Sequence, residues 1–502
     1  MLDKLRKRLT KEKLPGRKSN SDKSAMSFDL LYQLSYMSVI AASGVPRSQI
    51  FDRAAQLPCA AAEYFRKIEL ACKRLKYDYS RACRVVGEST KEEEVKGLLL
   101  RFSSSLLSGE PESEFLTRES EALAESYDNE YGRKLEAMKM WTDAYVSLIL
   151  SAVLVIIIGI VSTMIWQIET MVIIGMAFIA IMTTGLGVWL IYVVSPREST
   201  VLRWPGSKEQ RLAHKLLKLL APMALAAGTS LLLLGINAGW VLLVISAISF
   251  PIGFIMTSDD KKVAKRDAEV GVFLRSLGGV CAALGTTVNA ALSRLDLDSI
   301  NILRVTVRRL HTRLTAGIRS KLCWKRFIDE TGSELTNRSV GMFYDAIDLG
   351  GSAGQAGYQA SLFASKIALL RARRRTVSGP FRWLCIAMHG SVVVLLVFIT
   401  EVIMAFAGMV AQADASMPQV SGAAASATSF TAFNFAGLEL MGSLVLPLVL
   451  IFTVANAIAP ALADGGSKYK ILYNLAITAA ISGVSLVVLP TMASALFSSV
   501  PM

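Results

Sequence analysis

Apolar and polar positions form two alternating kinds of segment along the chain. Two charged stretches carry apolar residues at helical spacing, which is typical of amphipathic helices that pack into bundles. The remaining segments contain apolar runs that are long enough to cross a bilayer, since a spanning helix needs about 20 apolar residues. We predict seven spans, of which the third is the least apolar: 144–166, 171–194, 216–236, 239–257, 382–410, 437–462 and 471–497. The pattern predicts an all-α polytopic membrane protein with two helical-bundle domains.

The spans and bundles divide the chain into successive parts. A basic tail, which we expect to be flexible and attracted to an anionic membrane surface, precedes the first bundle. The predicted parts are the tail 1–26, the first bundle 27–143, four spans in 144–257 with a basic loop at 195–215, the second bundle 258–381, and three spans in 382–502.

Lysine and arginine are distributed asymmetrically about the spans. The segment 195–218 carries six of them, and further clusters precede the fifth span and follow the fourth. The alternate loops 167–170, 235–239 and 411–436 contain none. Because cytoplasmic loops of membrane proteins are enriched in these residues, we expect the N-terminus and both bundles in the cytoplasm and the C-terminus outside.

The two bundles share a pattern at an offset of about 242 residues, which indicates an internal repeat. Helix breaks at Gly44 and Gly109 in the first copy correspond to breaks at Gly285 and Gly351 in the second. An apolar helical stripe recurs at the same offset, as Phe65, Ile68 and Cys72 and then as Val307, Leu310 and Leu314. Each copy is followed directly by spans, so the sequence indicates one unit, a bundle followed by spans, that occurs twice.

The composition of the chain and the motifs that it lacks restrict the classes of function that it can have. The chain has 502 residues, a mean hydropathy of +0.45 and a net charge of +14. The positive charge flanks apolar runs, which favours contact with anionic lipid over nucleic acid. Neither a phosphate-binding GxxxxGK[ST] loop nor an HExxH zinc motif occurs, and the six cysteines show no CxxC spacing. We therefore expect free thiols, no cofactor, no bound metal and no catalytic activity.

The layout resembles the platform proteins of type IV pilus, type II secretion and archaeal flagellum machines, the secretion system F superfamily. The breaks at Ser43-Gly44 and Leu284-Gly285, and the arginine-rich run Arg371–Arg375 before a span, are similar to that family. The segment from Ala463 to Lys470, ADGGSKYK, looks like the archaeal FlaJ-like branch. The extra pair of spans after the first bundle departs from bacterial pilus members and favours an archaeal or tight-adherence type.

The resemblance implies a platform in the cytoplasmic membrane that holds the assembly site of a filament. A cytoplasmic hexameric ATPase would engage the bundles, and membrane helices would insert pilin-like subunits into an archaeal pilus, an archaellum or a type II secretion-like system. We also expect contact with membrane lipids and a homo-oligomer, a dimer. The alternative is a permease subunit of a transporter driven by a separate ATPase, because transporters also contain repeats.

Two sets of residues are candidates for contacts with partners. Seven basic residues beside the spans form one set; they anchor the topology or face the ATPase, and they are Lys208, Arg211, Lys261, Arg371, Arg373, Arg374 and Arg375. The other candidate is Glu401, the ionisable residue deepest within a span. It either contacts a filament subunit or a neighbouring helix, or lies near the outer interface.

Overall fold

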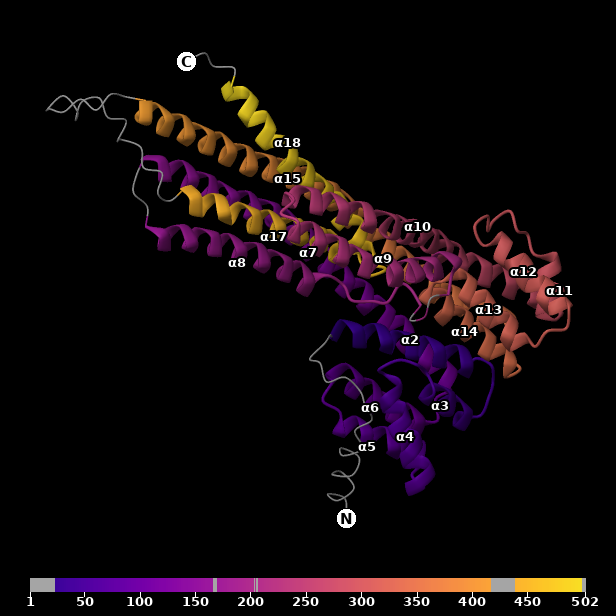
Figure 1. Cartoon of the computed structure of the whole chain (residues 1–502). Helices are drawn as coiled ribbons and strands as arrows, with labels where there is room; N and C mark the ends of the chain where they lie inside the picture. Colours follow the sequence, from indigo (N-terminus) through magenta and orange to yellow (C-terminus); the bar gives the residue numbers. More distant parts are fainter. Residues whose placement is uncertain (1–22, 166–168, 203, 205, 417–437, 499–502) are drawn as a thin grey trace. The chain divides into compact units, whose positions relative to one another are not determined.

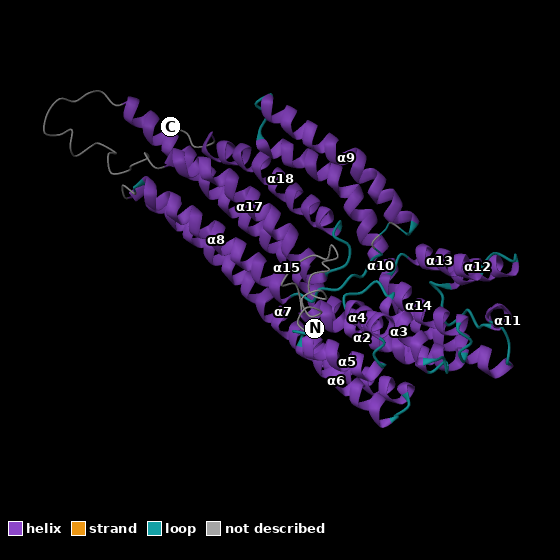
Figure 2. Ribbon diagram, turned by 90° about the horizontal axis from the view of Figure 1, so that it is seen from below, coloured by secondary structure: helices purple, strands orange, loops and turns teal. Residues whose placement is uncertain are grey.

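A computed structural model of the chain describes residues 23–165, 169–202, 204, 206–416 and 438–498. Within these ranges the regular secondary structure is helical (Figure 2). One isolated β-bridge in the described residues joins Val201 to Ser333. Most of the predicted basic tail and most of the predicted loop 411–436 lie outside the described residues. The predicted all-α class is confirmed.

Two sets of helices correspond to the two predicted copies (Figure 1). The first set is α2 (Lys23–Ala41), α3 (Arg47–Ala55), α4 (Ala62–Leu75), α5 (Tyr79–Ser89), α6 (Glu93–Ser108) and α7 (Glu112–Ile165). The second set is α10 (Ala238–Leu284), α11 (Val288–Arg294), α12 (Arg304–Thr315), α13 (Ser320–Thr331), α14 (Glu334–Asp348) and α15 (Ala353–Ser416). The other helices are α8 (Thr170–Val194), α9 (Lys208–Leu233), α17 (Leu438–Asp464) and α18 (Lys470–Ser498).

Helix starts recur at nearly the predicted offset. The helix α4 begins at Ala62 and α12 begins 242 positions later at Arg304, while α7 begins at Glu112 and α15 begins 241 positions later at Ala353. The stripe residues are also buried alike, since Phe65, Ile68, Val307 and Leu310 are each at most 1% exposed and Cys72 and Leu314 are half-buried. The same sequence period therefore produces the same helices twice.

Left-handed glycines end the helices at the breaks. Gly44, Gly109 and Gly285 have φ of +70°, +76° and +56°, a region in which a side chain would be strained. The second break of the second copy lies between Asp348 and Ala353 and contains the predicted Gly351, and the left-handed residue in it is Gly350, with φ of +87°. Gly351 is instead a close-packing site, because a Cβ there would come within 2.0 Å of the Ser43 hydroxyl.

The two predicted bundles lie in one compact unit, formed by Met1–Arg133, Pro196–Lys208 and Lys261–Ala372. We call it the bundle unit. Hydrogen bonds and rings join the copies directly: the Tyr36 hydroxyl donates to Asp345 at 2.8 Å, and the Phe28 ring stacks on Phe363 at 6.5 Å. Burial raises the pKa of the Asp345 carboxyl above its ordinary value.

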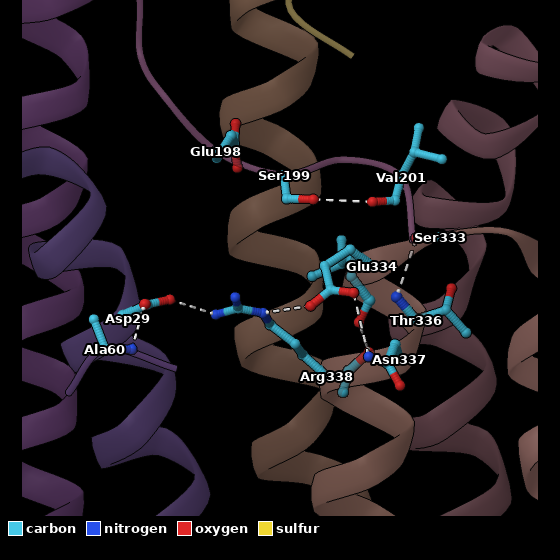
Figure 3. A network of polar contacts seen from close by, with 12 residues as sticks. Asp29, Ala60, Glu198, Ser199, Val201, Ser333, Glu334, Thr336, Asn337 and Arg338 are labelled. Atoms are coloured by element: carbon cyan, nitrogen blue, oxygen red, sulfur yellow. Dashed lines mark hydrogen bonds and ion pairs between the residues drawn. The ribbon is translucent and has the colours of Figure 1, made fainter. Parts of the chain in front are cut away.

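An arginine from the second copy is the centre of this contact (Figure 3). Arg338 of α14 forms ion pairs with Asp29 of the first copy at 3.0 Å and with Glu334 at 3.1 Å. Its guanidinium also lies 4.7 and 4.6 Å from the ring centroids of Phe28 and Tyr32. The side chain is buried, so its charge is compensated by these carboxylates and not by water.

The loop between α8 and α9 also belongs to the bundle unit. Its backbone pairs with the turn before α14, since the Glu334 amide donates to the Thr200 carbonyl at 3.1 Å and the Leu202 amide donates to Gly332 at 3.3 Å. The Ser333 hydroxyl caps α14 by accepting from the Thr336 amide at 3.1 Å. This pairing fixes the segment between α8 and α9 onto the bundles.

The remaining residues, Lys134–Ser195, Glu209–Asp260 and Arg373–Met502, form the membrane unit. Six described helices are long and apolar enough to cross a membrane, namely α7, α8, α10, α15, α17 and α18. The chain is therefore a polytopic all-α membrane protein, as predicted. The other predicted span, 216–236, falls largely within α9, and its crossing of the membrane stays a prediction.

Glycines allow close packing between α10 and α18 in the membrane unit. A Cβ on Gly253 would lie 2.3 Å from the Tyr473 amide nitrogen, and a Cβ on Gly483 would lie 2.8 Å from the Gly239 carbonyl oxygen. Small residues at such crossings let helix backbones approach within a bilayer.

The helices α7, α10 and α15 each continue for several turns on both sides of the boundary between the units. The boundary between the two units falls between Arg133 and Lys134 in α7, between Asp260 and Lys261 in α10, and between Ala372 and Arg373 in α15. The predicted boundaries between bundles and spans therefore fall inside continuous helices.

Candidate functional site

The arginine run of α15 is divided between the two units. Arg371 belongs to the bundle unit and Arg374, three residues later, to the membrane unit. Both are buried, at 3% and 4% exposure. A buried guanidinium needs compensating partners, and each of the two arginines has them within its own unit.

Arg371 is the centre of the first charged cluster, which we call the Arg371 cluster. Its guanidinium lies 2.8 Å from Asp267 of α10 and 3.2 Å from Glu198 of the α8–α9 loop, and it donates to the Ser199 carbonyl at 3.1 Å. Tyr131 of α7 donates to the second oxygen of Glu198 at 3.0 Å. The cluster therefore ties α7, α10, α15 and the loop together within the bundle unit.

Lys470 is the centre of the second cluster, the Lys470 cluster, in the membrane unit. Its ammonium donates to Asp260, the last residue of α10 in this unit, at 2.7 Å and also bonds Asp464 at the end of α17. Ser378 of α15 donates to the other oxygen of Asp464 at 2.9 Å. Four helices, α10, α15, α17 and α18, are joined here.

Arg374 completes the Lys470 cluster by capping α17. It donates to the Ala463 carbonyl at 2.8 Å and to the Leu462 carbonyl at 2.9 Å. The last carbonyls of a helix have no intrahelical donors and carry partial negative charge, so a cation there is favourable.

The ADGGSKYK segment supplies the turn of this cluster. Gly465 and Gly466 have φ of +69° and +84°. A Cβ on Gly465 would come within 2.7 Å of the Arg374 guanidinium carbon, and a Cβ on Gly466 would come within 2.5 Å of an Asp260 carboxylate oxygen. Both glycines are thus required by backbone conformation and by the proximity of charged side chains. The motif builds an ionic junction, which the sequence alone did not reveal.

The other predicted basic residues lie apart from these clusters. Lys208 and Lys261 are exposed in the bundle unit, whereas Arg211 and Arg373 are exposed and Arg375 is half-buried in the membrane unit. The sequence made Arg371 and Arg374 candidates for a surface that faces the ATPase. Both are buried in contacts within the protein, so they do not belong to an exposed surface of that kind.

A larger basic surface lies on α12 and α13. We call it the basic face, and it consists of Arg304, Arg308, Arg309, Arg313, Arg319, Lys321, Lys325 and Arg326. No Asp or Glu occurs from 304 to 326, whereas the equivalent segment 62–84 of the first copy contains three. Arg308 and Arg326 are exposed and make no ion pair within the described ranges. Comparing the charges of the two copies at the constant offset could have revealed this face.

A small hollow lies beside two residues of the basic face, Arg313 and Arg326. Its cavity of about 330 Å³ is also lined by the apolar Ile318, Leu322 and Cys323 and by Glu330, whose carboxylate pairs with Arg313. Ile318 and Leu322 are 46% and 45% exposed. An apolar hollow with a cationic rim suits an acidic partner that carries an apolar anchor.

Polar groups within the spans bond one another. The Tyr145 hydroxyl of α7 donates to the Asn456 oxygen at 2.8 Å, and the Asn456 amide nitrogen lies 3.1 Å from His389 Nδ1. His389 Nε2 lies 3.0 Å from the Ser482 hydroxyl of α18. This chain links four helices through buried side chains. The partners of His389 lie in other helices, so sequence spacing alone does not reveal them.

Glu401 lies in α15 and is half-buried. Within the residues described, no hydrogen bond or ion pair reaches its carboxyl group. Its placement agrees with either of the alternatives drawn from the sequence.

Comparison with known proteins identifies two relatives. Over 441 residues the chain is 24% identical to the flagella accessory protein J of Methanococcus voltae, covering 85% of this chain and 77% of the relative. Over 307 residues it is 26% identical to the flagella accessory protein J of Methanocaldococcus jannaschii, covering 58% of this chain and about half, 54%, of that relative. No family model and no solved structure matches. The predicted resemblance to the FlaJ-like branch is confirmed.

Proposed function

We propose that this chain, a homologue of the archaeal flagella accessory proteins J, is the membrane platform on which an archaellum-type or related pilus-like filament is assembled. A cytoplasmic assembly ATPase acts on the bundle unit, and the membrane unit passes the movement to filament subunits at the assembly site. Glu401 is the candidate intramembrane contact for such a subunit.

One observation carries the mechanical part of this proposal. The helices α7, α10 and α15 run unbroken from the bundle unit into the membrane unit, and a charged cluster holds α10 and α15 together in each unit. A continuous helix held by buried ion pairs is stiff, so force applied to the bundles reaches the spans. The permease alternative has less support, because the polar side chains Tyr145, Asn456, His389 and Ser482 are buried and bond one another.

The basic face is the candidate docking surface for the ATPase. Exposed cations that lack ion-pair partners would be compensated by acidic side chains of the motor, and the hollow beside them would hold an apolar anchor. Lys208 and Lys261 are further exposed cations of the same unit.

We expect the double variant Arg308→Glu/Arg326→Glu to weaken binding of the cognate ATPase at least about tenfold, or about 1.4 kcal/mol. The reason is that reversed charges would repel an acidic partner. Binding is measured with the purified motor and the full-length protein in nanodiscs at two salt concentrations. The matched control is Arg66→Glu/Arg84→Glu, which makes the same change 242 positions earlier in the first copy. Equal losses in both variants, or no loss in either, would refute docking at this face.

The proposed topology places both copies and the α8–α9 loop in the cytoplasm. Segments 196–208 and 261–372 belong to one compact unit, so the chain crosses the membrane an even number of times between them. On this topology α10, a candidate span, supplies one crossing and α9 supplies the other. The lysines near the start of α9 then lie at its cytoplasmic end, in agreement with the positive-inside rule.

A labelling experiment tests this topology. We expect Leu234→Cys, at an exposed position in the α9–α10 turn, to react with a membrane-impermeant maleimide in intact cells. Ser299→Cys, at an exposed position of the bundle unit, should react only after permeabilisation. Mass spectrometry separates both sites from the six native cysteines. Protection of position 234 in intact cells would contradict a crossing by α9.

A further inference from the structure

A large groove on the bundle unit has no occupant in the part of the chain that the structure describes. It has a volume of about 590 Å³ and lies between α2, α7 and α15. Its lining includes the buried Leu31 and Phe363 and two leucines of α15, Leu362 and Leu369, which are 41% and 52% exposed. Exposed leucines seven residues apart form an apolar strip along one helix face, and such strips outside a membrane span mark interaction sites.

The rim of this groove is acidic. Glu121, Glu125 and Asp128 of α7 line it, with Lys366 of α15 as the one basic residue of the lining. Glu121 and Glu125 are one helical turn apart and exposed, and neither forms an ion pair among the described residues. The groove therefore suits a segment with an apolar stripe and a cationic flank.

The N-terminal segment of the same chain has this chemistry. In a helix Leu2, Leu5 and Leu9 share one face, since they are three and seven positions apart. Residues 1–22 contain eight Lys and Arg but three Asp and Glu, and Pro15 marks the end of the pattern. These residues lie outside those described, so their sequence and their point of attachment carry the argument.

The point of attachment lies beside the groove. In the bundle unit α2 is antiparallel to α7, because Ser38 contacts Thr117 at 2.9 Å while the ring of Phe28 lies 5.9 Å from that of Tyr127. The start of α2 at Lys23 is therefore near the Asp128 end of the groove. The groove follows α7 from Thr117 to Asp128, about 16 Å at 1.5 Å per residue. Nine residues separate a helix over 2–13 from Lys23 and span up to about 30 Å when extended.

We propose that residues 2–13 bind in this groove as an amphipathic helix, with the leucines over Leu362 and Leu369 and the cations against Glu121 and Glu125. This contact is independent of the proposed function. It would cover a surface where the two copies meet, since Gln359 and Thr117 of the lining are joined across them at 3.4 Å. Tethering raises the local concentration of the segment, so a modest intrinsic affinity suffices.

Photo-crosslinking of the full-length protein tests the proposal. A benzophenone amino acid replaces Leu362 in protein held in nanodiscs of zwitterionic lipid, and crosslinked peptides are identified by mass spectrometry. We expect crosslinks to residues 1–14, and we expect their yield to fall at least about fivefold in Glu121→Lys/Glu125→Lys. The yield should also fall as salt rises, because exposed charge pairs are screened. The probe at Leu107, which is 69% exposed but outside the groove, is the positional control.

Two further controls in the crosslinking experiment test for other occupants of the groove. Glu114→Lys/Glu136→Lys makes the same charge change at exposed positions of α7 outside the groove and should leave the yield unchanged. Mixing isotope-labelled and unlabelled copies shows whether the crosslinked segment comes from a second copy. Crosslinks only between copies, a yield insensitive to the groove charges, or loss of crosslinks in anionic nanodiscs with binding of the segment to lipid instead would each overturn the proposal.

Discussion

Replacing Arg371 by alanine is expected to destabilise the bundle unit by about 3–5 kcal/mol, the usual cost of removing one partner from a buried ion pair. The substitution leaves the carboxylates of Glu198 and Asp267, with side chains 2% and 3% exposed, without their cation. The Ser199 carbonyl and the α8–α9 loop lose their bond to α15 as well. Thermal unfolding in detergent micelles, followed by a probe on the bundles, measures the loss.

The neighbouring arginine is the control for this variant. Arg373→Ala changes an exposed residue of the same run and should alter the unfolding temperature little. Arg371→Lys should be intermediate, because an ammonium retains the charge but cannot bond both carboxylates and the carbonyl with the same fork. An Arg371→Ala protein as stable as Arg373→Ala would mean that the cluster is solvated and contributes little.

The second large effect is expected from Lys470→Met, again about 3–5 kcal/mol, but in the membrane unit. Without the ammonium, Asp260 and Asp464 become a like-charged pair with side chains 8% and 17% exposed. The junction of α10, α17 and α18 should then open or fail to form. Protein yield in the membrane and thermal aggregation in detergent are the measurements.

A second-site change separates charge imbalance from simple loss of packing. Combining Lys470→Met with Asp260→Asn removes one of the two repelling charges and should restore part of the stability. Lys468→Met, at an exposed position two residues earlier, is the matched control. If the double variant were no more stable than Lys470→Met, the ionic account of this junction would be wrong.

Hydrophobic spacing was sufficient to predict most of the fold. The stripes at Phe65 and Val307, the breaks at Gly44, Gly109 and Gly285, and six of the predicted spans depend on local periodicity and on backbone conformations that favour glycine. Periodicity did not predict that α7, α10 and α15 continue through the bundle boundaries. A helix does not need to end where its environment changes from water to lipid.

The charged clusters could not be predicted in the same way. Arg371 and Arg374 precede a span and fit an anchoring pattern, and their burial depends on partners distant in sequence, such as Glu198, 173 positions away. Lys470 and Asp260 are 210 positions apart. Only a folded chain brings these residues together. By contrast, the basic face could have been found in the sequence, because the charges of the two copies can be compared at a constant offset.

The unequal charge of the two copies has a consequence for stoichiometry. If the proposed function holds, a hexameric motor offers six equivalent surfaces. Each platform chain carries only one basic face, because the matching segment of its first copy contains three carboxylates. One chain then engages one motor subunit at a time, and the ring and the platform differ in symmetry. Such a mismatch would let successive subunits of the ring act on the same platform chain in turn.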